Sequence, residues 1–398
     1  MSSVQYEQDI SGSIKNRPED FIVEELPLYD PSGDGEHLYL CVQKTGMTHE
    51  LMTRLIAKEM EVNQRAIGSA GRKDCNAITT QLVSVHLPGE EDRIPTFSHE
   101  GIVVLWHARH SNKLRTGHLL GNRFDIRLRG IDPTRVTTLQ KRLQILAQQG
   151  LPNFFGTQRF GNDQNNHLLG AAIITNRFEY LVEMILDGDE KHHQAAKSRD
   201  YKKALESWPL GNPLQQNILE TLANGKNFRE ASKRISKSLQ KLWVNALQSF
   251  IFNQTLRRRQ TDGTWDKMIN GDLAWKHDGG GRTFEVTAED LASAELLERT
   301  TRIEVSPTGP LWGPKMRKPA GKVFEDELDD LSEFDVSDEL QKNDRRLASG
   351  ARRPLRVKVG NPSIGGGVDE HGGFIRVQFE LPAGSYATVL IGEMLRIN

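Results

Sequence analysis

The sequence predicts an α+β protein in which a largely helical segment interrupts a mixed domain. Apolar and polar residues alternate, as in half-buried strands, over 78–87 and again over 374–381. From Leu151 to about Arg302, apolar residues instead recur at helical spacing. Because strand patterns lie on both sides of the helical part, we expect the C-terminal strands to rejoin the N-terminal domain. We expect residues 1–150 to form the first part of the mixed domain, 151–305 the largely helical segment, and 306–398 the second part of the mixed domain.

Strands and helices alternate in the N-terminal part. Bulky and polar residues alternate over 37–42, which predicts a strand. Thr48 is suited to cap a helix, because apolar residues recur at helical spacing from Leu51 onward. A second helix is expected over 133–149, and Gly150 is a suitable stop.

The helical part and the C-terminal part follow from the same patterns. Helices are expected over 168–186, 201–207, 214–223 and 236–259. The glycines at 279–281 predict a hairpin turn, and the turn-rich segment 306–313 is suited to a linker. The acidic stretch 325–344 predicts an exposed helix and loop. Strands return at 355–359 and 374–381, and a final helical run spans 385–395.

Length and composition exclude several classes of protein. A chain of 398 residues should hold about two domains, and its apolar runs stay well short of the ~20 residues of a membrane span. The first ten residues are polar and lack the apolar core of a signal peptide, so we expect a cytoplasmic protein with no membrane partner. Two cysteines exclude a disulfide scaffold and a cysteine-built metal site, and the histidines lack ligand spacing, so no metal is expected.

Charge is segregated along a chain whose net charge is only −1. Basic residues gather between Arg109 and Arg129 and between Arg229 and Arg259, and many of the balancing acids lie in 325–344. A basic face of this kind is typical of a protein that binds a polyanion. Two solvated helix or strand faces would give the same pattern, so charge alone leaves both interpretations open.

The stretch 71–81 holds one carboxylate, Asp74, in a basic loop just before a β-prone run. Arg72 and Lys73 precede it, and neighbouring positive charge favours the ionised form of a carboxylate. Such a carboxylate can act as a nucleophile or a base. The alternative is a surface turn whose charges are solvated.

Two further stretches combine aromatic residues with hydrogen-bond donors. In 113–124, Asn122 can pair with a base edge, and Phe124 can stack on a base or fill the core. In 153–161, three phenylalanines lie among Asn153, Arg159 and two glycines. Aromatic residues interleaved with donors can stack on and hydrogen-bond to nucleotides, although a packed domain junction would use the same residues.

Together these stretches resemble the TruD family of tRNA pseudouridine synthases. The matching segments occur in the family's order over nearly the full chain: 15–24, 71–81, 113–124, 153–161, 247–253, 306–313 and 381–388. The resemblance implies isomerisation of uridine to pseudouridine, usually at position 13 of tRNA, without a cofactor. It also implies a pseudouridine-synthase catalytic domain with a mixed, mainly antiparallel sheet, interrupted by a TRUD insertion domain.

The resemblance also implies roles for individual residues. Asp74 matches the family's catalytic aspartate, and Lys15 matches a basic residue that keeps it ionised and oriented. Phe124 would stack against the flipped uracil with support from Asn122, and Phe379 would line the pocket or simply fill the core. The other residues expected to bind substrate are Arg72, Lys73, Lys113, Asn153 and Arg159.

Several alternatives stay open at this point. Asp74 could attack the sugar, attack the base, or abstract a proton during glycal formation. A non-catalytic RNA-binding protein would need the basic and aromatic residues but not Asp74, and a hydrolase would pair Asp74 with a histidine. The expected partner is tRNA, with the protein a monomer that needs no obligatory protein partner. Binding should weaken as salt rises, through counterion release.

Overall fold

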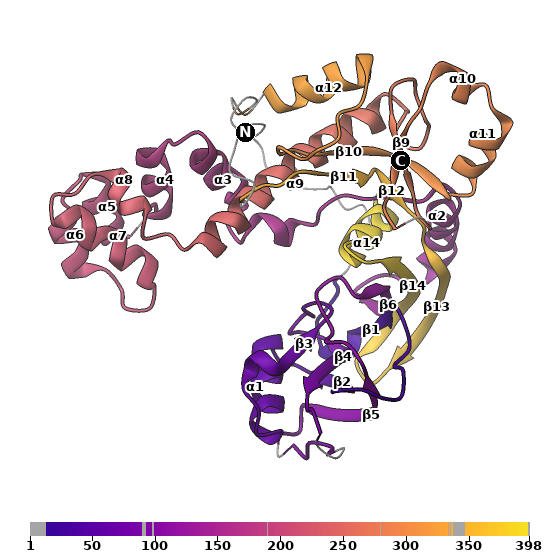
Figure 1. Cartoon of the computed structure of the whole chain (residues 1–398), viewed down its shortest axis with the longest axis horizontal. Coiled ribbons are helices and arrows are strands. Elements are labelled where there is room, and N and C mark those ends of the chain that lie inside the picture. Colours follow the sequence, from indigo (N-terminus) through magenta and orange to yellow (C-terminus); the bar gives the residue numbers. More distant parts are fainter. Residues whose placement is uncertain are drawn as a thin grey trace. The chain divides into compact units, whose positions relative to one another are not determined.

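The computed structural model describes residues 13–89, 93–97, 99–188, 190–278, 280–332, 334, 336 and 347–396. Within these residues the chain forms two compact units (Figure 1). Residues 13–151 and 357–396 make one, here called the sheet unit, and Pro152–Arg356 make the other, here called the helical unit. The chain therefore leaves the sheet unit once and returns to it once.

The sheet unit is built on eight strands. They are β1 (Phe21–Pro27), β2 (His37–Thr45), β3 (Ile67–Ser69), β4 (Ile78–His86), β5 (Ile102–His110), β6 (Leu119–Arg129), β13 (Gly360–Asp369) and β14 (Gly372–Pro382). Their order is β13-β14-β6-β1-β4-β2-β5, with β3 paired to β4. Only β1 and β4 run parallel among these pairs, which confirms the expected mixed, mainly antiparallel sheet.

The described residues of the sheet unit include three α-helices: α1 (His49–Glu59), α2 (Val136–Gln149) and α14 (Ala387–Leu395). The expected cap of α1 is confirmed, because the Thr48 side chain accepts a hydrogen bond from the backbone N–H of Leu51 at 3.2 Å. The expected stop of α2 is confirmed as well. Gly150 has a φ of 92°, a conformation that glycine adopts without strain.

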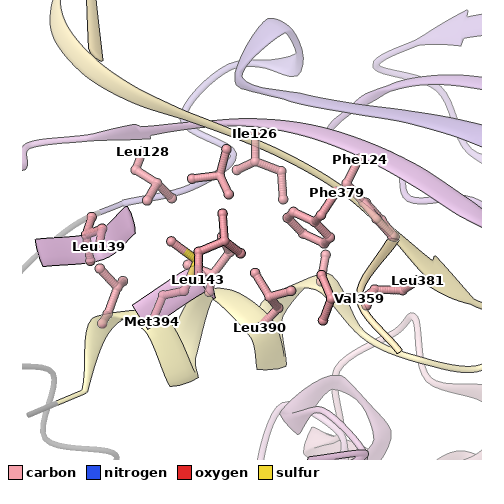
Figure 2. Packing of buried hydrophobic residues seen from close by; sticks show 14 of the residues in the cluster. Phe124, Ile126, Leu128, Leu139, Leu143, Val359, Phe379, Leu381, Leu390 and Met394 are labelled. Carbon is pink, nitrogen blue, oxygen red and sulfur yellow. The ribbon is translucent and has the colours of Figure 1, made fainter. Parts of the chain in front are cut away.

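The two largest apolar clusters described on the sheet include residues of its helices. In the first, β6 contributes alternate residues such as Phe124 and Ile126, which pack with Leu143 of α2 and Leu390 of α14 (Figure 2). In the second, alternate residues of β2 and β4 pack with residues of α1; its β2 members are Leu38, Leu40 and Val42. The period of two places every second side chain of a strand on the covered face.

The helical unit contains ten α-helices and a small sheet within its described residues. The helices are α3 (Asn166–Ile174), α4 (Phe178–Ile185), α5 (Lys191–Lys197), α6 (Tyr201–Ser207), α7 (Pro213–Ala223), α8 (Phe228–Ser232), α9 (Lys237–Thr261), α10 (Ala288–Leu291), α11 (Ala294–Thr301) and α12 (Gly321–Ser332). The strands are β8 (Leu273–Lys276), β9 (Thr283–Glu285), β10 (Val305–Leu311) and β11 (Ala351–Pro354), in the order β11-β10-β8-β9. The single helix expected over 168–186 is two helices, since Asn176 adopts a left-handed φ of 55° between α3 and α4.

The segment expected to be a linker is a central strand. β10 pairs with β8 on one side and β11 on the other, and six of its seven residues are buried. Its two prolines and one glycine favour a turn in sequence, but these neighbours bury the segment in the structure. The chain therefore returns to the sheet unit at Val357 rather than at residue 306. The short strands β7 (Leu151–Pro152) and β12 (Arg356–Val357) pair where the chain leaves and re-enters this unit.

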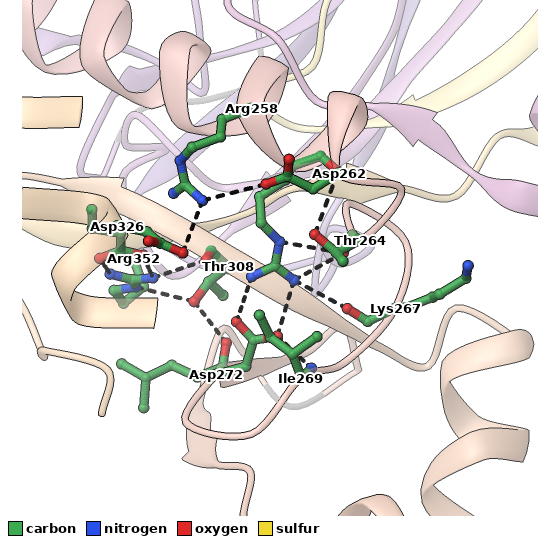
Figure 3. Close-up of polar contacts among 12 residues, drawn as sticks. Arg258, Asp262, Thr264, Lys267, Ile269, Asp272, Thr308, Asp326 and Arg352 are labelled. Carbon is green, nitrogen blue, oxygen red and sulfur yellow. Dashed lines mark hydrogen bonds and ion pairs between the residues drawn. The ribbon is translucent and has the colours of Figure 1, made fainter. Parts of the chain in front are cut away.

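Two arginines near the end of α9 are neutralised by acids (Figure 3). Arg258 pairs with Asp326 at 3.3 Å and Asp330 at 3.0 Å, both on α12. Arg259 pairs with Asp272 at 2.8 Å, with both side chains almost fully buried. The acidic stretch expected to be exposed is thus partly buried against α9, while residues 333, 335 and 337–346 lie outside the described residues. No described helix has a stretch long and apolar enough to cross a membrane.

Candidate active site

The site centres on Asp74, in the loop between β3 and β4. Its Oδ2 accepts a hydrogen bond from Nζ of Lys15 at 2.6 Å. The Asp74 side chain is 40% exposed and that of Lys15 21% exposed, so the pair sits at the surface of the sheet unit without being fully solvated. The structure therefore brings together the two residues expected to be catalytic, although they are far apart in sequence.

Lys15 reaches Asp74 from an unusual backbone conformation. Its φ is 63°, in the left-handed region that residues other than glycine rarely adopt. Its Nζ lies 4.3 Å from the centroid of the Phe21 ring, within the range of a cation–π contact. Strained backbone of this kind is common at functional sites, where the surrounding contacts hold it in place.

Lys73 points away from solvent, in contrast to its expected contact with RNA. Its Nζ lies 2.9 Å from Oε2 of Glu25, and the two side chains are only 7% and 1% exposed. The same ammonium donates to Oδ1 of Asn122 at 2.8 Å. Because Glu25 lies on β1 and Asn122 is its register partner on β6, Lys73 ties the Asp74 loop to the centre of the sheet. We therefore assign Lys73 to the support of the site rather than to phosphate binding.

Three phenylalanines lie in the apolar cluster beside this network. Phe124 and Phe379 are register partners on β6 and β14, and their rings stack with centroids 5.3 Å apart (Figure 2). Phe21 of β1 meets Phe124 edge-on at 6.2 Å. All three are buried, and Phe379 is 1% exposed. Phe379 therefore belongs to the core, and Phe124 and Phe21 have most of their ring surface covered by protein.

Arg72 and Lys113 have partners within the sheet unit. The Arg72 side chain is exposed and pairs with Glu50 of α1 at 3.0 Å. Lys113 donates to the backbone carbonyl of Arg65 at 2.5 Å. Of the two basic residues in the Asp74 loop, Arg72 is thus the one whose charge faces solvent, while Lys113 holds a nearby turn.

Asn153 and Arg159 belong to the helical unit and hydrogen-bond to other residues of that unit. Asn153 is buried, and its Nδ2 donates to the carbonyl of Pro354 at 2.9 Å while its Oδ1 accepts from Arg353 at 2.6 Å. Nε of Arg159 donates to Oγ of Ser249 on α9 at 3.2 Å. These contacts match a packed junction, the alternative that the sequence left open for this stretch.

Three arginines of the basic stretch 109–129, namely Arg123, Arg127 and Arg129, pair with acids in the structure. Arg123 pairs with Glu24 and Glu380, each at 2.9 Å, across three neighbouring strands. Arg129 pairs with Asp20 and Asp369, each at 2.7 Å. The acids lie on β1, β14, the end of β13 and the short 3-10 helix Pro18–Asp20, so their positions in the sequence do not show that they meet Arg123 and Arg129. The basic surface of the folded protein is therefore smaller than the run of basic residues in the sequence suggests.

Sequence reasoning missed three residues near Asp74: Phe21, Glu25 and Lys44. Nζ of Lys44, on β2, donates to the backbone carbonyl of Asp74 itself at 2.7 Å. Phe21 falls within the matched segment 15–24, and Glu25 follows it directly, so motif position could have marked both. Over the described residues, no group of three or more His, Cys, Asp or Glu side chains is arranged to hold a metal ion.

Comparison with known proteins covers nearly the whole chain. The sequence model of the family described as tRNA pseudouridine synthase D (TruD) matches residues 3–394. The chain belongs to the TruD family. It is 35% identical to the tRNA pseudouridine synthase D of Geotalea daltonii, with 97% of this chain and 96% of that protein aligned. It is 32% identical to a tRNA pseudouridine synthase D of Thermus thermophilus, with 98% and 90% aligned.

A solved structure supports the same membership in the TruD family. The crystal structure of the putative tRNA pseudouridine synthase D from Methanosarcina mazei superposes with a TM-score of 0.80 at 27% identity. The superposition covers 99% of this chain and 96% of that one. The resemblance seen in the sequence is thereby confirmed, and the fold is that of the TruD family.

Proposed function

We propose that this chain is a tRNA pseudouridine synthase that converts a uridine of tRNA to pseudouridine, with Asp74 as its catalytic carboxylate. Membership in a family whose relatives are named tRNA pseudouridine synthase D supports the reaction and the substrate class. The 2.6 Å contact between Lys15 and Asp74 is the observation that supports the role of Asp74. Position 13 is the uridine we assign, as the usual target of the family.

Asp74 carries out its role through the oxygen that Lys15 does not hold. The ammonium of Lys15 bonds to Oδ2, so Oδ1 is the atom that we assign to the substrate. The reaction breaks the bond between the sugar and N1 of uracil, turns the base over, and forms a bond from the sugar to C5. It conserves atoms and oxidation state. Two routes use the same oxygen: covalent attack by the carboxylate, or abstraction of a proton during glycal formation.

The uridine must leave its stack to reach Asp74, at a cost of a few kcal/mol. We assign Asn122 to bind the flipped base, and its contact with Lys73 supports a defined orientation of its amide. An ammonium only donates hydrogen bonds, so its contact with Lys73 requires Asn122 to present Oδ1 to Lys73. The amide hydrogens of Asn122 are then the donors for a carbonyl oxygen of uracil. Phe21 and Phe124 supply the apolar wall next to this position.

Replacement of Asp74 by Asn tests the proposal. The variant keeps the size of the side chain but removes its charge, so we expect pseudouridine formation to fall by on the order of 10²–10⁴-fold, with tRNA binding retained. Asp34→Asn, at an exposed position between β1 and β2, is the matched control and should keep full activity. Undiminished turnover by Asp74→Asn would refute the assigned role and leave an RNA-binding protein as the better interpretation.

The substrate position needs its own measurement. Transfer RNA in which cytidine replaces uridine at position 13 should give no product, while the unmodified transcript should give one pseudouridine at that position. The mass of the RNA should not change, since isomerisation adds and removes nothing. Release of a free base would instead favour the hydrolase.

We further propose that the protein is a cytoplasmic monomer. Size-exclusion chromatography with light scattering tests the monomer, which should have the molecular mass of about one chain.

A further inference from the structure

Lys44 is a fully buried lysine directly beneath the Asp74 loop. Its side chain, on β2, is 0% exposed. Its Nζ donates two short hydrogen bonds, to the backbone carbonyl of Met47 at 2.6 Å and to that of Asp74 at 2.7 Å. Burial of a charged group costs free energy unless hydrogen bonds compensate it, and lysine is among the residue types least often buried completely. A role is therefore expected for a lysine at this position.

The pattern of β2 shows how unusual this position is. Leu38, Leu40 and Val42 face the apolar cluster under α1, and Lys44 is the next residue in the same alternation. A residue of the same phase would ordinarily be apolar. Its register partner on β4 is Thr79, which is also fully buried. Near the Asp74 loop, the buried face of the sheet therefore carries the polar side chains of Lys44 and Thr79 in place of apolar ones.

The two bonds of Lys44 hold the main chain at two separate places. Met47 lies in the turn that leads into α1, and Asp74 lies in the loop before β4. One ammonium therefore joins both segments to the same strand. Lys15 holds the carboxylate of Asp74, whereas Lys44 holds its main-chain carbonyl. The side chain and the backbone of Asp74 are thus fixed by different lysines.

We propose that Lys44 is a positioning residue for the isomerisation, which fixes the main chain at Asp74 so that the carboxylate is held within reach of the nucleotide. The inference rests on the proposed function of Asp74. Lys44 is buried beneath the loop, so it acts through Asp74 and not on the RNA. Misplacement of a catalytic group by about 1 Å can lower the rate by roughly 100-fold. Loss of Lys44 should therefore lower kcat and leave the KM for tRNA unchanged.

Lys44→Met tests this, because methionine fills a similar space and has no donor for either carbonyl. Leu40→Ala is the matched control: it lies on the same strand and face, is fully buried, and contacts the apolar cluster instead of the Asp74 loop. Both variants should lower the thermal stability of the sheet unit. Pseudouridine formation gives kcat and KM, and hydrogen exchange of a peptide covering residues 71–77 reports the order of the loop directly.

We expect kcat of Lys44→Met to fall by roughly 100-fold with KM unchanged, while Leu40→Ala keeps kcat. Exchange over 71–77 should be faster by about tenfold or more in Lys44→Met alone. Wild-type kcat in Lys44→Met, or equal loss of kcat in both variants, would overturn the proposal. If Lys44→Met does not fold, Lys44→Gln replaces it. The amide nitrogen of glutamine lies one bond closer to the backbone than Nζ of lysine and so falls short of the two carbonyls. The same changes in kcat and in exchange are then expected.

The exchange measurement separates this proposal from the proposed function. If the wild-type protein forms no pseudouridine, the assigned reaction fails, but exchange over 71–77 still decides whether Lys44 holds the loop. Faster exchange in Lys44→Met than in Leu40→Ala supports the positioning role. Equal exchange in the two variants contradicts it whatever the reaction is.

Discussion

Removal of the Lys73 ammonium should destabilise the sheet unit far more than loss of a surface charge. Lys73 and Glu25 pair at 2.9 Å with side chains 7% and 1% exposed. Lys73→Met leaves the Glu25 carboxylate buried without its partner, and loss of one member of a buried pair costs about 3–5 kcal/mol. Lys233→Met is the control, because its pair with Glu230 is exposed and should contribute less than about 1 kcal/mol.

A double variant separates the structural effect from the catalytic one. In Lys73→Met with Glu25→Gln neither member of this pair is charged, and glutamine still offers an acceptor to the backbone N–H of Leu82, which Glu25 holds at 3.3 Å. We expect most of the stability to return. Pseudouridine formation should stay about 10–100-fold low in both variants, because Asn122 has lost the charged donor that fixes its amide.

Urea unfolding provides the free energies, and hydrogen exchange of β1 and β4 amides reports the sheet unit separately from the helical unit. A loss below about 1 kcal/mol in Lys73→Met would refute the argument, since it would mean that the pair is solvated. Return of activity in the double variant would refute the link from Lys73 to Asn122.

Two further predictions concern stability. Burial lowers the pKa of both His277 and His167 to about 4 from 6.5, so between these values the unfolded chain binds more protons than the folded one. The free energy of unfolding of the helical unit should therefore be highest above pH 6.5 and fall as the pH drops toward 4. In urea unfolding, His277→Gln should remove about half of that fall. An unchanged dependence of the free energy on pH in His277→Gln would contradict the role given to this histidine. Gly170→Ala should cost roughly 1–3 kcal/mol, because its Cβ would lie 2.3 Å from the backbone oxygen of Trp243. Gly392→Ala in α14 meets nothing within 4 Å and should gain up to about 1 kcal/mol, and thermal unfolding of the two variants compares them.

Local signals in the sequence predicted elements well where the structure depends on neighbours in the chain. The cap at Thr48 and the stop at Gly150 need only adjacent residues, and both predictions are confirmed. The segment 306–313 was different. Its prolines and glycines favour a turn, and only the flanking strands β8 and β11 make most of it a buried strand. Partners of that kind cannot be found from local composition.

The candidate site shows the same limit. Motif order identified Asp74 and Lys15, and the structure places them in contact. Lys73 follows Arg72 directly, yet Arg72 is exposed and Lys73 is buried. The difference depends on Glu25 and Asn122, which reach Lys73 in its loop from strands β1 and β6. Composition of the loop carries no information about those partners.

The order of the strands has a consequence for the synthesis of the protein on the ribosome. β6 lies between β1 and β14, but β14 is translated only after the whole of Pro152–Arg356. At about 5–20 residues per second, that interval lasts on the order of 10–40 s. During it, β6 is an edge strand of the nascent chain, and Phe124 lacks its stacking partner Phe379. An exposed edge with apolar side chains favours pairing with other chains, so this interval is when the growing protein is most open to aggregation and most in need of a chaperone.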